Sequence, residues 1–109
     1  MRNLLSTLIP VALVSVVASA QAKELPANDR YVCSWGAGTA ARAQELKLSG
    51  VSLYAARQKI QTYKFNKSWM RMMALGITEQ TYDSPSRFKP AAVRESFYQD
   101  CLRYKVARK

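Results

Sequence analysis

The sequence predicts an all-α fold: a small four-helix antiparallel bundle closed by one disulfide, preceded by a signal peptide that is removed. Three observations predict it. Apolar residues recur at helical spacing in four segments, Cys33 and Cys101 lie near the two ends of the helical region, and the first 22 residues resemble an export signal. No alternation of apolar and polar residues is sustained over a strand's length, so an all-β fold is not expected.

The N-terminus is predicted to be a secretory signal peptide over residues 1–22. A start charged by Arg2 is followed by an apolar run and by a small-residue cleavage site, with cleavage after Ala20 or Ala22. The apolar run is short for a bilayer span and contains Pro10, which argues against the alternative of an uncleaved anchor. We therefore expect a periplasmic or secreted product in which residues 23–109 form a single helical domain.

A disulfide between Cys33 and Cys101 is expected. The 87 residues that remain after cleavage (109 less 22) are few for a stable core, and an exported pair of cysteines meets an oxidising compartment. In the chain-entropy model, closing so long a ring is worth about 4 kcal/mol. The alternatives are two free buried thiols and an intermolecular disulfide.

The first helix is predicted from Asp29, suited to the N-cap, to Gly50, suited to the left-handed position after a helix. Its apolar positions are Val32, Trp35, Ala43 and Leu46. Ser52 is the predicted N-cap of a second helix, which ends at a break over residues 66–68. The apolar stripe of this helix is Leu53, Ala56, Ile60 and Tyr63.

The third helix is predicted to run until Asp83, where Ser84 and Pro85 stop it. Its expected inner face is Trp69, Met72, Met73, Gly76, Ile77 and Gln80. Since this helix is apolar on nearly every side, it either lies at the centre of the fold or leaves a face for a partner or a homodimer.

The fourth helix is predicted to begin at Pro90, which suits the first turn of a helix. Its predicted inner side holds Val93, Phe97, Cys101 and Tyr104. In an up-and-down bundle, the start of the first helix and the end of the fourth share one end of the molecule, which is where the two cysteines lie.

The stretch from Gly36 to Ala41 matches the G-x-G-x-x-A pattern of dinucleotide-binding sites. That pattern requires a preceding strand and a βαβ unit, and neither is predicted here. We interpret the stretch as a face of small residues that lets another helix approach closely.

The chain is strongly basic and contains no histidine. Its formal charge of +10 falls to +9 when Arg2 is lost with the signal peptide. No acidic residue lies between Glu45 and Glu79, whereas six cations do: Lys47, Arg57, Lys59, Lys64, Lys67 and Arg71. This segment is expected to attract acidic partners.

The basic aromatic segment from Arg57 to Arg71 is the strongest functional candidate. Its predicted partner-binding residues are Arg57, Lys59, Lys64, Lys67 and Arg71. Tyr63, Phe65 and Trp69 lie among them, as in binders of lipid headgroups or nucleic acid. The alternative is that these rings face the core while the lysines are solvated. Nucleic acid is not expected, because no recognised motif accompanies the segment.

No catalytic or metal-binding residues are predicted, and no cofactor is expected. Met70, Met72 and Met73 would suit a soft metal, but without histidine they are interpreted as core residues. Glu79 and Asp83 are four residues apart and are the candidates for a hydrolase that uses carboxylates. Two carboxylates near a helix end are more often solvated surface, so a non-enzymatic role is favoured.

Three local patterns resemble those of small exported helical proteins of Gram-negative bacteria. They are Cys33-x-Trp35-Gly36, Gly50-x-Ser52 and Phe97-Tyr98-x-x-Cys101. The resemblance implies export, the disulfide and the helices, and it implies no activity.

Together these features predict a basic, non-enzymatic periplasmic or secreted protein that docks an acidic protein partner, as an inhibitor or an immunity-type factor does. The alternative is binding to an anionic membrane surface or lipopolysaccharide through the same segment. A small hydrolase is the third hypothesis.

Overall fold

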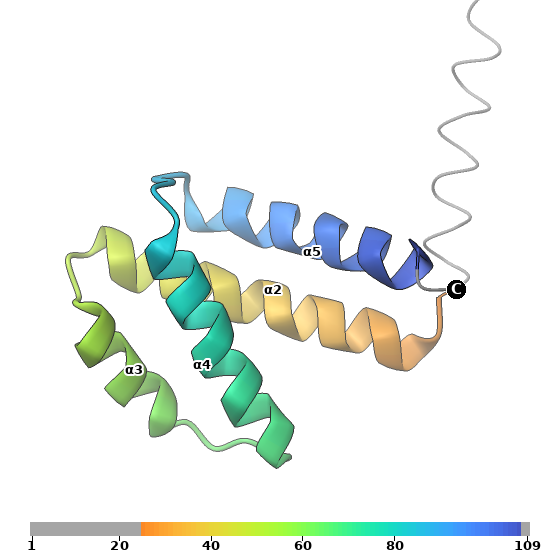
Figure 1. Ribbon diagram of the computed structural model, residues 1–109, viewed down its shortest axis with the longest axis horizontal. Helices are drawn as coiled ribbons and strands as arrows, with labels where there is room; N and C mark the ends of the chain where they lie inside the picture. Colours follow the sequence, from red (N-terminus) through yellow and green to blue (C-terminus); the bar gives the residue numbers. More distant parts are fainter. Residues whose placement is uncertain (1–24, 108–109) are drawn as a thin grey trace, which may run out of the picture.

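The computed structural model describes residues 25–107, which form four α-helices and no strand (Figure 1). The helices are α2 (Ala27–Leu48), α3 (Leu53–Gln61), α4 (Ser68–Asp83) and α5 (Pro90–Ala107). The prediction of an all-helical fold is confirmed. The predicted signal peptide lies outside the described residues.

Helix α2 is the centre of the fold. It lies side by side with α5 along its length, α4 packs across it, and α3 packs mainly on α4 (Figure 1). Eight of its residues are buried, most of them small: Cys33, Gly36, Ala37, Ala40, Ala41, Ala43, Gln44 and Leu46. The small-residue face predicted for the first helix is therefore what allows its neighbours to approach.

Gly36 is the position of closest approach. A Cβ atom built there would lie 2.7 Å from Phe97 Cε1 of α5 and 3.3 Å from Met73 Cε of α4. At Gly38, by contrast, no heavy atom lies within 4 Å of such a Cβ atom. Only the first of the two glycines is thus required by packing.

The disulfide is confirmed. The sulfur atoms of Cys33 and Cys101 are 2.08 Å apart and the Cα atoms 5.5 Å apart. Cys33 packs with Leu25 and Leu102 in a small apolar cluster, and the Lys105 ammonium lies 3.7 Å from the Asp29 carboxylate at the same end. One end of α2 is therefore joined to the end of α5 by a covalent bond, apolar contact and an ion pair.

The other end of α2 is joined to the segment that leads into α5. The Gln44 side-chain amide donates to the carbonyls of Ser86 (3.2 Å) and Phe88 (2.8 Å). The Lys47 ammonium donates to three more carbonyls, those of Thr81 (3.1 Å), Ser84 (2.9 Å) and Ser86 (2.7 Å). Lys47 therefore completes the end of α4 and belongs to the fold more than to the basic surface.

The turn between α2 and α3 forms as predicted. Gly50 has φ of +84°, and Val51 N donates to Leu46 O (3.0 Å), as in a Schellman motif. Ser52 caps α3, since its hydroxyl accepts a hydrogen bond from Ala55 N (3.1 Å).

Two predicted features of the first two helices are wrong. Helix α2 begins at Ala27 directly after extended Pro26, so Asp29 lies in the first turn and is not the N-cap. Helix α3 ends at Gln61, where i to i−3 bonds from Thr62 and Tyr63 tighten the chain, so Tyr63 lies beyond its stripe.

The predicted inner face of α4 is correct only in part. Ile77 is buried, and Met73 is half-buried and lies over Gly36 of α2. The buried residues are Met70, Ala74, Ile77 and Thr78, whereas Met72 is 77% exposed. Since the helix is apolar on several sides, two different faces satisfy the same 3.6-residue period. Contact with α2 and α3 selects the inner face.

In α5, Val93, Phe97 and Cys101 are half-buried, in line with the prediction. Tyr104, predicted to face inward, is 61% exposed, and Leu102 is buried in its place. The reason is that Leu102 reaches the apolar cluster around Cys33 and Leu25 at the disulfide end.

Candidate functional site: an aromatic and cationic groove

Four aromatic rings from three parts of the fold gather beside α2. Trp35 of α2 lies edge-to-face with Trp69 of α4 (centroids 5.8 Å apart) and with Phe65 of the α3–α4 connection (6.2 Å). Tyr63 lies 6.5 Å from Phe65. Edge-to-face pairs at these distances are favourable, so the rings hold the connection against α2.

The rings are neither fully buried nor fully solvated. Tyr63 and Trp69 are each 38% exposed, and Trp35 and Phe65 are half-buried. The interpretation that these rings face the core is therefore confirmed only in part, and the binding role of the aromatic segment stays a prediction. The rings pack on one another at the edge of the core and keep surface in contact with solvent.

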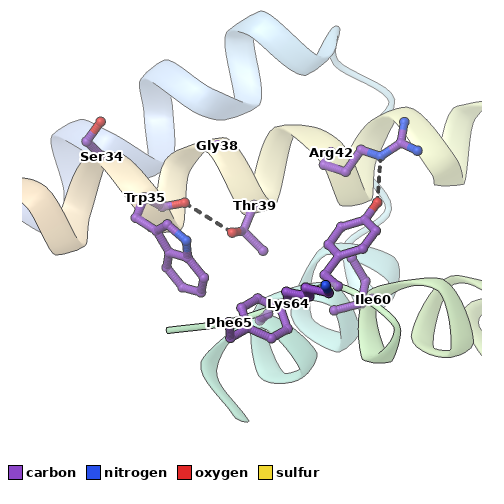
Figure 2. Close-up of a pocket in the computed structure, with 10 residues that line it drawn as sticks. Ser34, Trp35, Gly38, Thr39, Arg42, Ile60, Lys64 and Phe65 are labelled. Atoms are coloured by element: carbon purple, nitrogen blue, oxygen red, sulfur yellow. Dashed lines mark hydrogen bonds between the residues drawn. The ribbon is translucent and has the colours of Figure 1, made fainter. Parts of the chain in front are cut away.

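A groove of about 400 Å³ lies between α2 and the α3–α4 region (Figure 2). Its lining residues are Ser34, Trp35, Gly38, Thr39, Arg42, Ile60, Tyr63, Lys64, Phe65 and Ala74. Ile60 and Ala74 are buried. Gly38 has no side chain, and no atom lies within 4 Å above it. The groove is thus mostly apolar with a few polar groups, the usual composition of a ligand site.

Arg42 is the best-fixed cation of the groove. Its Nε donates to the Tyr63 hydroxyl (3.2 Å), and its Nη1 donates to the Glu45 carboxylate. The hydrogen bond with Tyr63, followed by that with Glu45, raises the pKa of Arg42 above its already high ordinary value. The guanidinium therefore remains charged at every physiological pH and is held at one end of the groove.

Arg71 positions the groove wall. Its guanidinium carbon lies 5.4 Å from the centroid of Phe65, a cation–π contact, and its Nη1 donates to the carbonyl of Gln61 at the end of α3. Arg71 therefore joins the end of α3 to the face of one ring.

The five predicted partner-binding residues divide into two groups. Arg57 pairs with Glu79, and Arg71 holds Phe65 and Gln61. The second group is formed by the three lysines, Lys59, Lys64 and Lys67. They are exposed and have no ion pair within residues 25–107. Only Lys64 lines the groove.

Ser34 lines the groove and was not predicted, and three further unpredicted groove residues share one face of α2: Trp35 as a surface group, Thr39 and Arg42. They lie at i, i+4 and i+7, one face of a helix, so the spacing carries a signal. The signal is weak, because the rings that face them come from a segment about 30 residues further along the chain.

The candidate hydrolase residues lie outside the groove. Glu79 is paired with Arg57, and neither Glu79 nor Asp83 lines the groove. The three adjacent methionines also diverge, since Met70 is buried and Met72 is exposed. Across residues 25–107, no three His, Cys, Asp or Glu side chains are close enough to hold a metal ion, and no helix is both long and apolar enough to cross a membrane.

Comparison of the chain with protein-family models, with curated proteins and with solved structures yielded no match.

Proposed function

We propose that this protein is an exported, non-enzymatic binding protein that docks an acidic protein partner through the aromatic and cationic groove. One observation carries the proposal: exposed aromatic surface lies beside Arg42 and Lys64 in a single concave site. The Glu45 carboxylate beside the groove is already engaged by Arg42. Aromatic and arginine side chains are the types most enriched where protein partners bind tightly.

Export is supported by the character of residues 1–22 and by the disulfide, since disulfides persist in oxidising compartments. We also infer that the helices pack antiparallel. The contacts between Cys33 and Cys101 at one end of α2, and between Gln44 and Phe88 at the other, support this for α2 and α5. Such a scaffold holds the groove on rigid helices, as suits an inhibitor or immunity-type factor.

The charge of the groove region can be tested separately from the charge of the whole protein. The triple variant K59Q/K64Q/K67Q removes three exposed cations from the aromatic segment. A matched control, R87Q/K89Q/R94Q, removes three exposed cations from the region around the start of α5. Both variants lower the formal charge from +10 to +7.

The assay is crosslinking of the purified protein in envelope extract, followed by mass spectrometry of the captured proteins. We expect an acidic protein that is captured by the wild type and by the control, lost with the lysine variant, and lost at high salt because the attraction is screened. Equal loss with both variants would mean that only total charge matters, and the groove would then not be the docking site.

Binding to an anionic membrane is the second candidate, favoured by exposed Met72 and Trp69 close in sequence to Lys67 and Arg71. Co-sedimentation with vesicles that contain about 30% anionic phospholipid tests it, since a few basic residues suffice to attract a protein to such a surface. Membrane binding predicts that sedimentation falls when Met72 is replaced by serine and when salt is raised. Sedimentation that ignores lipid charge would argue against it.

A further inference from the structure

The groove has an aromatic end and a cationic end. Figure 2 shows the rings of Trp35 and Phe65 close together, with Arg42 toward the other end of the same stretch of α2 and Thr39 between them. The Thr39 hydroxyl donates to Trp35 O (3.1 Å), so it is satisfied within the helix. A ligand that fills the groove would therefore place an apolar group at one end and an anionic group at the other.

The cationic end has unused binding capacity. A guanidinium carries five N–H donors. Two of them are used, by Tyr63 and by Glu45, which leaves three. Lys64 also lines the groove, and its ammonium group has no ion pair within the described part of the chain. Carboxylates are well matched to these donors, because an arginine guanidinium can donate to both oxygens of one carboxylate.

The aromatic end of the groove is suited to bind another aromatic ring. Trp35 and Phe65 are half-buried and already lie edge-to-face, so a third ring can extend the cluster in the geometry that aromatic pairs prefer. A groove of about 400 Å³ falls in the range of sites that enclose a small group, not in the range of an extended flat interface.

We infer that the groove takes one aromatic side chain of the acidic partner, with a neighbouring carboxylate held by Arg42 and Lys64. This inference rests on the proposed function and deepens it, because it names the recognised element: an aromatic residue within an acidic segment. Charge complementarity between the cationic end and such a segment is what selects this occupant over an uncharged one.

The structure provides a way to block the groove without altering its charge. Leucine at Gly38 adds a side chain into open groove space, where no atom lies within 4 Å of the Cβ position. Leucine at Gly76 is the matched control, since Gly76 is also helical, exposed and open, and does not line the groove. Both changes favour the helix, so neither is expected to unfold the protein.

The test uses three labelled pentapeptides, EEWEE, EEAEE and KKWKK, with binding measured by fluorescence anisotropy at low salt. We expect EEWEE to bind the wild type and G76L about tenfold more tightly than EEAEE, and KKWKK not to bind. In G38L we expect the advantage of EEWEE over EEAEE to disappear. Circular dichroism verifies that both variants are folded.

A second measurement uses the wild-type protein and needs no substitution in the groove. In proton–nitrogen NMR spectra, the indole N–H signal of Trp35, assigned by comparison with a W69F variant, should shift when EEWEE is added and not when EEAEE is added. An unchanged Trp35 signal would overturn the inference, whatever the behaviour of G38L.

The outcomes separate this inference from the proposed function. If EEWEE and EEAEE bind equally and both are lost with K59Q/K64Q/K67Q, the groove does not take a ring, but docking to acidic proteins stands. If no peptide binds at about 1 mM, a weak-affinity limit, the inference also falls. Binding of KKWKK equal to that of EEWEE would remove the role of the carboxylate. Failure of the crosslinking experiment alone would instead remove the proposed function.

Discussion

Alanine at Gly36 and alanine at Gly38 form a matched pair that isolates the packing of α2 against its neighbours. Both positions lie in the interior of the same helix, so each substitution adds one methyl group with the same gain in helix propensity. Only their surroundings differ. At Gly36 the methyl carbon would lie 2.7 and 3.1 Å from two atoms of the Phe97 ring and 3.3 Å from Met73 Cε, and at Gly38 it meets nothing within 4 Å.

The expected magnitudes follow from these distances. Replacing a helical glycine with alanine stabilises by about 0.5–1 kcal/mol, which is the full expected effect at Gly38. Carbon atoms pack best at about 3.5–4.0 Å, so the Phe97 ring must move to admit a methyl group at Gly36. Such overpacking costs about 1–3 kcal/mol. Gly36→Ala should therefore be about 1–3 kcal/mol less stable than Gly38→Ala, since the propensity gain cancels in the comparison.

The assay is urea unfolding of the oxidised protein, followed by circular dichroism at 25 °C, with thermal unfolding as a second measurement. A difference of 1 kcal/mol corresponds to about 4–8 °C in Tm for a domain of this size. Equal stabilisation by the two substitutions would refute the reasoning. It would mean that Phe97 and Met73 do not close over Gly36, and the packing of α4 and α5 on α2 would then need revision.

Three further predictions concern stability. Replacing Cys33 and Cys101 with alanine should lower the free energy of unfolding by about 4.4 kcal/mol, the chain-entropy value for the sequence separation of 68 residues, as measured by urea unfolding. Lys47→Met removes the ammonium from three carbonyls and should cost about 1.5–3 kcal/mol in the same assay, whereas Lys59→Met at an exposed site should cost less than about 0.5 kcal/mol. Burial raises the pKa of Tyr82 above its ordinary value. The stability that the neutral phenol contributes should therefore be complete below about pH 10 and be lost as the pH rises through the raised pKa. Urea midpoints measured against pH should show this fall in the wild type, and Tyr82→Phe should remove it.

Each of these predictions has an outcome that contradicts it. A urea midpoint of the wild type that is unchanged by reductant would show that the disulfide contributes little. Equal effects of methionine at Lys47 and at Lys59 would show that the three carbonyls do not depend on the ammonium. Parallel pH profiles of the wild type and Tyr82→Phe would show that the Tyr82 phenol does not govern stability in alkali.

Much of the fold could be predicted from the sequence, because its boundaries depend on local chemistry. Gly50 occupies a backbone conformation with positive φ, Ser52 caps the helix that follows, and Pro90 opens the last helix. The disulfide followed from the number of cysteines and the predicted compartment. To predict these features, one needs only the residues that are close in sequence, or the number of cysteines.

Only one wall of the candidate site could be predicted from the sequence. The segment that contains Tyr63, Phe65 and Lys64 stood out as aromatic and basic, but its opposite wall did not. Trp35 and Arg42 are in a helix that also has buried small residues, and their spacing on one helix face was only a weak sign of function. Their part in the groove depends on α3 and α4 folding back across α2.

By itself, the sequence determined that the domain is helical, that Ser52 and Pro90 open two of its helices, that two cysteines join, and that the α3 to α4 region is basic. Only the tertiary structure decided which side of α4 is buried, that Lys47 completes the end of α4, and that Trp35 lies against Phe65. The physical reason is the range of the interactions. Caps, turns and charge act over a few residues, whereas the choice among several apolar faces is made by contact between helices that are distant in the chain.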